Sequence, residues 1–186
     1  MVLVNDILTF WYGDADLSQN GEFREAWFKS DPAFDAEIKD KFLLAVKTAA
    51  LGGHDDWMET AMGSLALCIL LDQFPRNLFR GRARAFETDS KAREIAGNAI
   101  SVGFDASVSP VKRSFFYLPF MHSEDLDDQV RSVELYRALG NENNYRYALE
   151  HYFVISRFSR FPTRNAALGR HSTEEEEKFM VGFDAF

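Results

Sequence analysis

Helix start and stop signals divide almost the whole chain into amphipathic helices. Asp31-Pro32 is typical of a helix start, and the apolar residues after it recur three or four positions apart, as on one face of a helix. No segment shows the clean alternation of a strand bounded by hairpin turns, and a short helix is expected around residues 7–12. The sequence therefore predicts an all-α fold of about 7 to 9 helices. Further starts are expected at Asp55, Asp89, Ser109, Ser123, Asn143 or Asn144, and Ser172.

Proline and glycine give the expected helix ends. Pro75 is expected to stop the helix that starts at Asp55, and Pro162 the helix that starts at Asn143 or Asn144. Pro119 lies inside a helical pattern and is expected to kink or end that helix near Tyr117. In the helix after Ser123, the periodicity predicts an apolar face of Leu126, Val130 and Val133.

The organisation of the chain favours one domain. It has 186 residues and no linker rich in Gly, Ser or Pro, so we expect a single domain over residues 1–186. The expected helix starts at Asp55, Asp89 and Ser123 are each 34 residues apart, which is the period of the tetratricopeptide helix pair. This spacing favours stacked helical hairpins over a four-helix bundle.

Composition excludes several classes of protein in their usual form. The net charge of −8 disfavours nucleic-acid binding, and no apolar run approaches the roughly 20 residues of a membrane helix. The single cysteine, Cys68, lies in an apolar run and is expected to be an inert core residue, and nothing resembles a secretory leader, so a cytoplasmic location is expected. No metal-ligand spacing, phosphate-binding loop or dinucleotide fingerprint is present, so we expect neither a metal nor a cofactor.

One self-similarity stands out from this background. Phe74-Pro75-Arg76-Asn77 is followed by Gly81-Arg82, and Phe161-Pro162-Thr163-Arg164-Asn165 is followed by Gly169-Arg170, with Arg, Asn, Gly and Arg each 88 residues apart. We call residues 74–82 the first copy and residues 161–170 the second copy. Each copy closes a long apolar helix with residues suited to a turn.

The two copies lie in windows that are rich in arginine and free of acidic residues. Residues 73–86 hold four arginines and residues 151–173 hold four more, and neither window contains lysine. The planar guanidinium suits bidentate capture of a carboxylate or phosphate. Two interpretations stay open: the arginines cap helix ends, or the two windows meet around a solvent-open cleft that binds an anion. The candidate ligand-binding residues are Arg76, Asn77, Arg80, His151, Arg160, Arg164 and Asn165.

His122 is the candidate for acid–base chemistry. It precedes Ser123, Glu124 and Asp125, and a histidine with adjacent carboxylates can act as a general acid or base near neutral pH. The alternative is that Ser123 caps a helix, that Glu124 and Asp125 complement its dipole, and that His122 is a loop residue. His151 falls on a stripe with Tyr147 and other large residues, which is typical of a core histidine.

Five motifs, spread over nearly the whole chain, are specific enough to compare with known families. They are Phe10-Trp11-Tyr12-Gly13, Trp27-Phe28, Leu70-Leu71-Asp72-Gln73-Phe74-Pro75-Arg76-Asn77, Tyr117-Leu118-Pro119-Phe120-Met121-His122-Ser123-Glu124-Asp125 and Arg160-Phe161-Pro162-Thr163-Arg164-Asn165. Together they resemble the bacterial family called domain of unknown function 924. The resemblance implies a tetratricopeptide-like, right-handed stack of helical hairpins and supplies no function.

Three functions follow as hypotheses. The first is a binding module whose groove, lined by the candidate residues, takes an anionic small molecule or an acidic or C-terminal peptide segment. The second is a cofactor-free hydrolase or lyase in which His122 is the acid or base and Glu124 or Asp125 orients it. The third is a structural or interaction protein with a large exposed apolar patch. Binding without catalysis is favoured, and the oligomeric state stays open.

Overall fold

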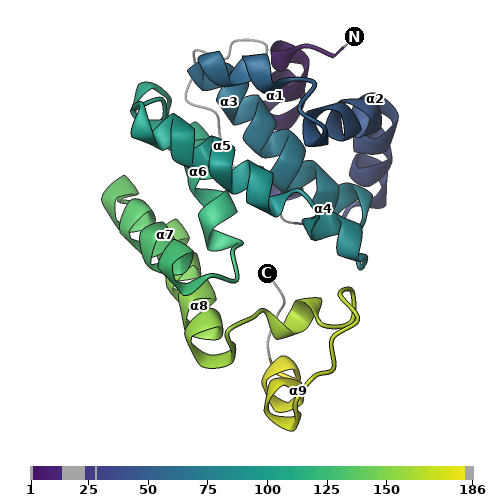
Figure 1. The fold of residues 1–186 in the computed structure, drawn as a ribbon, viewed down its shortest axis with the longest axis vertical. Helices are drawn as coiled ribbons and strands as arrows, with labels where there is room; N and C mark the ends of the chain where they lie inside the picture. Colours follow the sequence, from purple (N-terminus) through teal and green to yellow (C-terminus); the bar gives the residue numbers. More distant parts are fainter. Residues whose placement is uncertain (1, 14–23, 28, 183–186) are drawn as a thin grey trace. The chain divides into compact units, whose positions relative to one another are not determined.

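The computed structural model describes residues 2–13, 24–27 and 29–182, and these are helical with no strand among them. The prediction of an all-α fold is confirmed. Phe28, which belongs to one of the family motifs, lies outside the described residues. The helices (Figure 1) are α1 Val4–Tyr12, α2 Pro32–Ala50, α3 Ala61–Cys68, α4 Phe74–Leu78, α5 Asp89–Ser101, α6 Pro110–Met121, α7 Leu126–Leu139, α8 Glu142–Phe158 and α9 Glu174–Met180.

These helices form two compact units. Unit 1 comprises Met1–Arg80 and Arg84–Pro119, and unit 2 comprises Gly81–Ala83 and Phe120–Phe186. The first copy of the turn lies mostly in unit 1 and the second copy lies in unit 2. The single domain over 1–186 and the tetratricopeptide-like stacking both stay predictions.

An aromatic core holds unit 1 together. Helix α3 packs against α1 and α5, and α2 packs against α4. Trp11 is fully buried, stacks on Trp27 at 5.9 Å between ring centroids, and contacts Phe74 and Phe115 edge-on. Each such ring removes a large apolar surface from water, so this cluster gives a structural role to some of the chain's 18 phenylalanines. Cys68 lies in the same core and burial raises the pKa of its thiol, so the expectation of a buried cysteine is confirmed.

Pro75 does not stop the helix, contrary to prediction. The chain continues from α3 through a π-helical segment, Ile69–Gln73, into α4, where Pro75 lies in the first turn. Proline lacks the N–H that would bond to the carbonyl of Leu71, but the hydroxyl of Thr88 donates to that oxygen instead. The guanidinium of Arg76 likewise donates to the carbonyl of Asp72. With these carbonyls satisfied, the helical run tolerates the proline.

Several helix boundaries also differ from the predictions. Asp31 caps α2 as expected, with its side chain accepting hydrogen bonds from the N–H groups of Ala33 and Phe34. Elsewhere the cap moves by a few residues, because neighbouring polar residues compete for the position and the local backbone decides between them. Pro119 is accommodated inside α6, which continues to Met121. The side-chain caps are Thr60 for α3 and Asp125 for α7, in place of the expected Asp55 and Ser123. Asn141 caps α8 in place of Asn143 or Asn144, and Thr173 caps α9 in place of Ser172. Asp89 is the first residue of α5 rather than its cap.

Unit 2 is built on the antiparallel pair α7 and α8, which pack side by side (Figure 1). The predicted apolar face of α7 is wrong: Leu126 and Val130 remain 46% and 42% exposed, while Gln129, Ser132 and Tyr136 are buried. The amide of Gln129 donates to the carbonyls of Met121 and Ser123 at 2.7 Å each. The carbonyl groups at the buried end of α6 need hydrogen-bond donors. Gln129 supplies them, so the face of α7 that carries Gln129 is buried in place of the apolar face.

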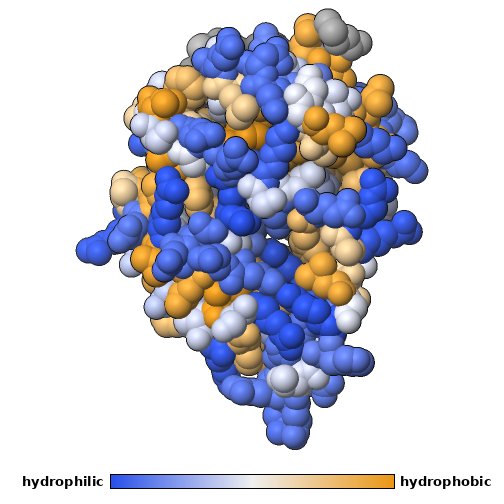
Figure 2. Space-filling model, in the orientation of Figure 1, coloured by the Kyte–Doolittle hydropathy of each residue, from blue (hydrophilic) through white to orange (hydrophobic). Residues whose placement is uncertain are grey.

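Exposed apolar side chains are scattered over several helices. On the face drawn in Figure 2, small apolar groups are separated by hydrophilic side chains. The interaction-protein hypothesis therefore stays a prediction. The large apolar side chains with the greatest exposure include Leu44, Leu51, Val102, Phe153 and Val181.

Candidate functional site

In the first copy of the turn, Arg76 is enclosed by carboxylates. Its two terminal nitrogens form a bidentate pair with Asp89 at 2.9 and 3.0 Å, and a third contact reaches Asp72 at 3.3 Å. Burial works against the charged form of Arg76, but the charges of Asp72 and Asp89 outweigh it, so the pKa of Arg76 is raised. Only 20% of the Arg76 side chain is exposed. This guanidinium therefore ties the first residue of α5 to the π-helical segment.

Asn77 and Arg80 hold a single carboxylate between them. The amide of Asn77 donates to Oδ1 of Asp35 at 2.8 Å, and Arg80 binds both oxygens of Asp35 at 2.6 and 2.9 Å. Asp35 lies in the first turn of α2. The first copy thus fixes the beginning of a helix that lies 42 residues earlier in the chain.

A similar arrangement occurs in unit 2, where Asn165 of the second copy is joined by Arg160, the residue just before that copy. Arg160 binds both oxygens of Glu176 at 2.6 and 2.7 Å, and the amide of Asn165 lies 3.4 Å from Oε2 of Glu176. Glu176 lies in the first turn of α9 and forms a capping box with Thr173. The hydrogen bond from Arg160 and the N–H of Thr173 lower the pKa of Glu176 to about 2.

Arg170, the last residue of the second copy, has its own carboxylate partner. It binds both oxygens of Glu124 at 2.7 and 2.9 Å, and the N–H of Phe161 donates to the same carboxylate at 2.8 Å. Burial disfavours the Glu124 carboxylate, but the bonds from Arg170 and Phe161 outweigh it, so the pKa of Glu124 is lowered. Asp125 caps α7 through the N–H groups of Asp127 and Asp128. The hydrolase or lyase hypothesis, in which Glu124 or Asp125 orients His122, stays a prediction.

His122, His151, Phe161 and Arg164 meet in unit 2, and we call them the His–Arg cluster. The imidazole centroids of His122 and His151 are 6.2 Å apart. Arg164 donates to the backbone carbonyl of His122 at 2.9 Å, and its guanidinium lies over the Phe161 ring, 4.4 Å from the centroid. His151 contacts the edge of the same ring at 5.6 Å. Arg164 and His151 therefore both contact a buried phenylalanine, and His122 joins them through its contacts with each.

The backbone fixes the tautomer of His151. Nδ1 lies 2.8 Å from the carbonyl oxygen of Tyr147, which can only accept, so Nδ1 carries the proton in the neutral ring. Nε2 is then an acceptor when the ring is neutral and a donor when it is protonated. His151 is buried, as expected from the stripe on which it lies, whereas His122 and Arg164 are partly exposed.

The candidate residues are thus divided between the two units. Arg76, Asn77 and Arg80 belong to unit 1, while His122, Glu124, His151, Arg160, Arg164 and Asn165 belong to unit 2. The expectation that both windows line one cleft stays a prediction.

Sequence reasoning missed three of the carboxylates that the arginines bind. Asp35, Glu124 and Glu176 lie outside the two windows and reach them only through tertiary contacts. A usable signal was present, because Asp35 and Glu176 each lie within a few residues of a helix start, where acidic residues are favoured by the dipole.

Two other kinds of feature are absent from the part of the chain that the structure describes. Within residues 2–13, 24–27 and 29–182, no group of three or more His, Cys, Asp or Glu side chains is arranged to hold a metal ion. Among the helices of that part of the chain, none is both long enough and apolar enough to cross a membrane.

The fold and site define an all-α protein in which paired turns fix helix starts by ion pairs, with a His–Arg cluster beside the second turn. Residues 7–182 match the family described as bacterial protein of unknown function (DUF924), and the chain belongs to this family. It is similar to a solved structure, the protein of unknown function ATU0120 from Agrobacterium tumefaciens, with 42% sequence identity, a TM-score of 0.89 and coverage of 97% of each chain. A comparison with curated proteins gave no match.

Proposed function

We propose that this chain is a binding module, and that the His–Arg cluster holds an anionic small molecule or an acidic peptide segment. The observation that carries the proposal is the grouping of Arg164 with two imidazoles whose centroids are 6.2 Å apart. All three side chains are donors to an anion when the imidazoles are protonated.

The contacts of Arg164 support this role because they orient the guanidinium. The ring of Phe161 supports one face of it, and the carbonyl of His122 accepts from one terminal nitrogen. A guanidinium held in one plane loses less conformational entropy when it binds a carboxylate or phosphate. The proposal gives Arg76, Asn77 and Arg80 a scaffolding role, since carboxylates of unit 1 already bind them.

The experiment is a thermal-shift screen followed by calorimetric titration. The probes are inorganic phosphate, nucleotides, di- and tricarboxylates, and acidic peptides. A ligand at about 100 times its Kd stabilises the folded state by about 2.7 kcal/mol. We expect one class of anion to raise Tm, and we expect Arg164→Ala and His122→Ala to abolish that increase. His122→Ala is informative because the bond from Arg164 goes to the backbone of residue 122 and survives the substitution.

Arg157 offers a matched control in the same unit. Its guanidinium also lies over a phenylalanine, Phe158, at 4.9 Å, but it is paired with Glu175 and is 56% exposed. Arg157→Ala is expected to bind the anion as the unmodified protein does. Equal losses in Arg157→Ala and Arg164→Ala, or a screen without any shift, would contradict the proposal.

A further inference from the structure

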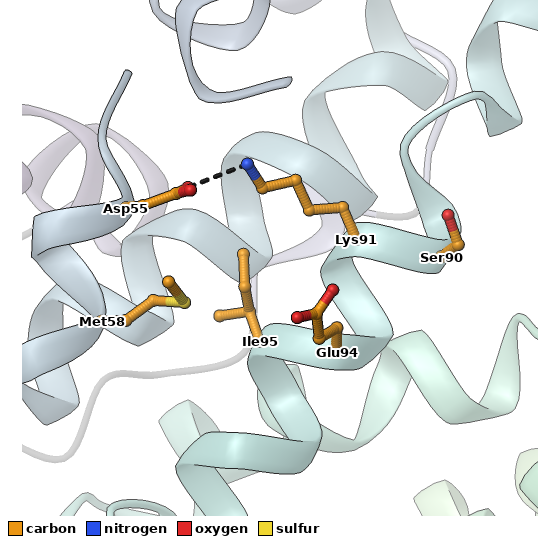
Figure 3. A pocket seen from close by; sticks show the side chains of 6 residues that line it. All are labelled: Asp55, Met58, Ser90, Lys91, Glu94 and Ile95. Atoms are coloured by element: carbon orange, nitrogen blue, oxygen red, sulfur yellow. Dashed lines mark ion pairs between the residues drawn. The ribbon is translucent and has the colours of Figure 1, made fainter. Parts of the chain in front are cut away.

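A hollow of about 300 Å³ lies in unit 1 between α5 and the short 3-10 helix Asp55–Glu59 (Figure 3). Small-molecule sites begin at about this volume. Its lining residues are Asp55, Met58, Ser90, Lys91, Glu94 and Ile95. None of them belongs to either copy of the turn or to the His–Arg cluster, so the inference is independent of the proposed function.

The hollow carries a positively charged group in a fixed position. Nζ of Lys91 lies 2.8 Å from Oδ1 of Asp55, and 25% of the Lys91 side chain is exposed. Gly52, at φ +87°, borders the pair: a Cβ there would lie 3.0 Å from Oδ2 of Asp55 and 3.7 Å from Nζ of Lys91. The lysine head is therefore held at the wall rather than free in solvent.

The same hollow carries a carboxylate that is not neutralised. Glu94 lies one turn after Lys91 on α5 and is exposed, and no ion pair or hydrogen bond of its side chain occurs within the described part of the chain. Figure 3 shows Lys91 and Glu94 rising from α5, with Asp55 and Met58 facing them from the 3-10 helix. A negative and a positive group thus border one space.

The remaining lining residues offer both polar and apolar contacts. The hydroxyl of Ser90 belongs to an exposed residue next to Lys91, and it can donate or accept. Ile95 is 1% exposed and Met58 is partly buried, so these two side chains give the hollow an apolar part. A thioether side chain adapts readily to ligands of different shape.

We propose that this hollow binds a small zwitterion of the α-amino acid class. Its ammonium group lies against Glu94, its carboxylate lies against Lys91 and Ser90, and its side chain contacts Met58 and Ile95. A simple anion would meet the carboxylates of Asp55 and Glu94, and a simple cation would meet Lys91. A molecule with one positive and one negative group can place each of them against the opposite charge of the lining. Ligands with a single charge are disfavoured, because like-charge contacts cost binding free energy.

The test is a titration of the purified chain with free α-amino acids, in which binding is measured by calorimetry and by ligand-observed NMR. Each amino acid that binds is compared with its N-acetylated form and its C-amidated form. We expect saturable binding of the free form and affinity at least about tenfold lower for each blocked form, which corresponds to about 1.4 kcal/mol.

Two variants and one control locate the site. Glu94→Gln and Lys91→Gln should each weaken binding at least about tenfold, whereas Glu134→Gln, an exposed glutamate of α7, should leave it unchanged. Glu94→Gln breaks no described ion pair, so it tests the site without disturbing the fold. The proposal is overturned by absence of saturable binding at millimolar concentrations, by equal binding of the N-acetylated form, or by unchanged binding in Glu94→Gln.

Discussion

The two copies of the turn share a left-handed glycine and an asparagine that contacts a carboxylate, and they differ in what surrounds the first arginine. Gly81 and Gly169 have φ of +69° and +66°, and in both copies an asparagine and a nearby arginine contact one carboxylate in the first turn of another helix. In the first copy, however, Arg76 is closed off by two aspartates, whereas Arg164 in the second copy lies over Phe161, donates to the backbone carbonyl of His122 and acts on Glu124 through its charge. The asparagine and the nearby arginine fix the start of another helix in both cases. The position that differs is that of Arg76 and Arg164, and a ligand site can arise there in the second copy.

The largest expected difference between the copies is the effect of removing this arginine. Arg76→Ala leaves Asp72, which is 1% exposed, without its cation, and breaking a buried ion pair costs about 3–5 kcal/mol. Arg164→Ala removes a bond to a carbonyl, a partly exposed contact with a ring and the attraction of its charge for Glu124, which is half-buried rather than fully buried, so the cost is expected to be smaller than in Arg76→Ala. Urea unfolding of both variants measures the difference. A loss below 1 kcal/mol in Arg76→Ala would mean that the first copy is not the more tightly paired one.

Removing the asparagine should affect both copies alike. Asn77→Ala and Asn165→Ala each remove a buried donor to a carboxylate, at a cost of about 1–3 kcal/mol in the free energy of unfolding. Unfolding curves in urea provide the comparison, with Asn98→Ala on the exposed side of α5 as the control. A large loss in only one copy would show that the two asparagines do not have the same structural role.

Alanine at the glycine of each copy should have a smaller and equal effect. A Cβ at Gly81 or Gly169 would meet nothing within 4 Å, so only the positive φ opposes the substitution. That backbone penalty is about 1 kcal/mol or slightly more. Differential scanning calorimetry of Gly81→Ala and Gly169→Ala gives the two values, and unequal values would indicate that the two turns are strained differently.

Acidification should destabilise the second copy while leaving it unchanged near neutral pH. The pKa of Glu176 is lowered to about 2 by Arg160 and Thr173, from 4.5 in an unstructured chain. A lowered pKa in the folded state gives stability that is complete above about pH 5 and is lost as pH falls toward 2. Urea unfolding between pH 7 and pH 2.5 should show this decline, and Glu176→Gln should flatten it. An unchanged slope in Glu176→Gln would assign the acid sensitivity to other carboxylates.

Part of the fold and part of the site could be predicted from the sequence. The start of α2 at Asp31-Pro32 and the burial of Cys68 within an apolar run follow from local rules, and the structure confirms them. The buried face of α7 did not follow, because Gln129 is held by carbonyls at the end of α6. Pro75 was misjudged for the same kind of reason, since the donor that replaces its N–H is Thr88, thirteen residues later in the chain.

The arginine windows separate what the sequence determined from what the tertiary structure decided. The sequence by itself determined the helices, the repeated turn and the absence of acidic residues near its arginines, because these depend on residues close together in the chain. Which carboxylate neutralises each arginine was decided by the tertiary structure: Asp35 is 45 residues from Arg80, and Glu124 is 46 residues from Arg170. Coulomb attraction depends on distance in space, so a window free of acidic residues in the sequence becomes ion-paired once the helices pack.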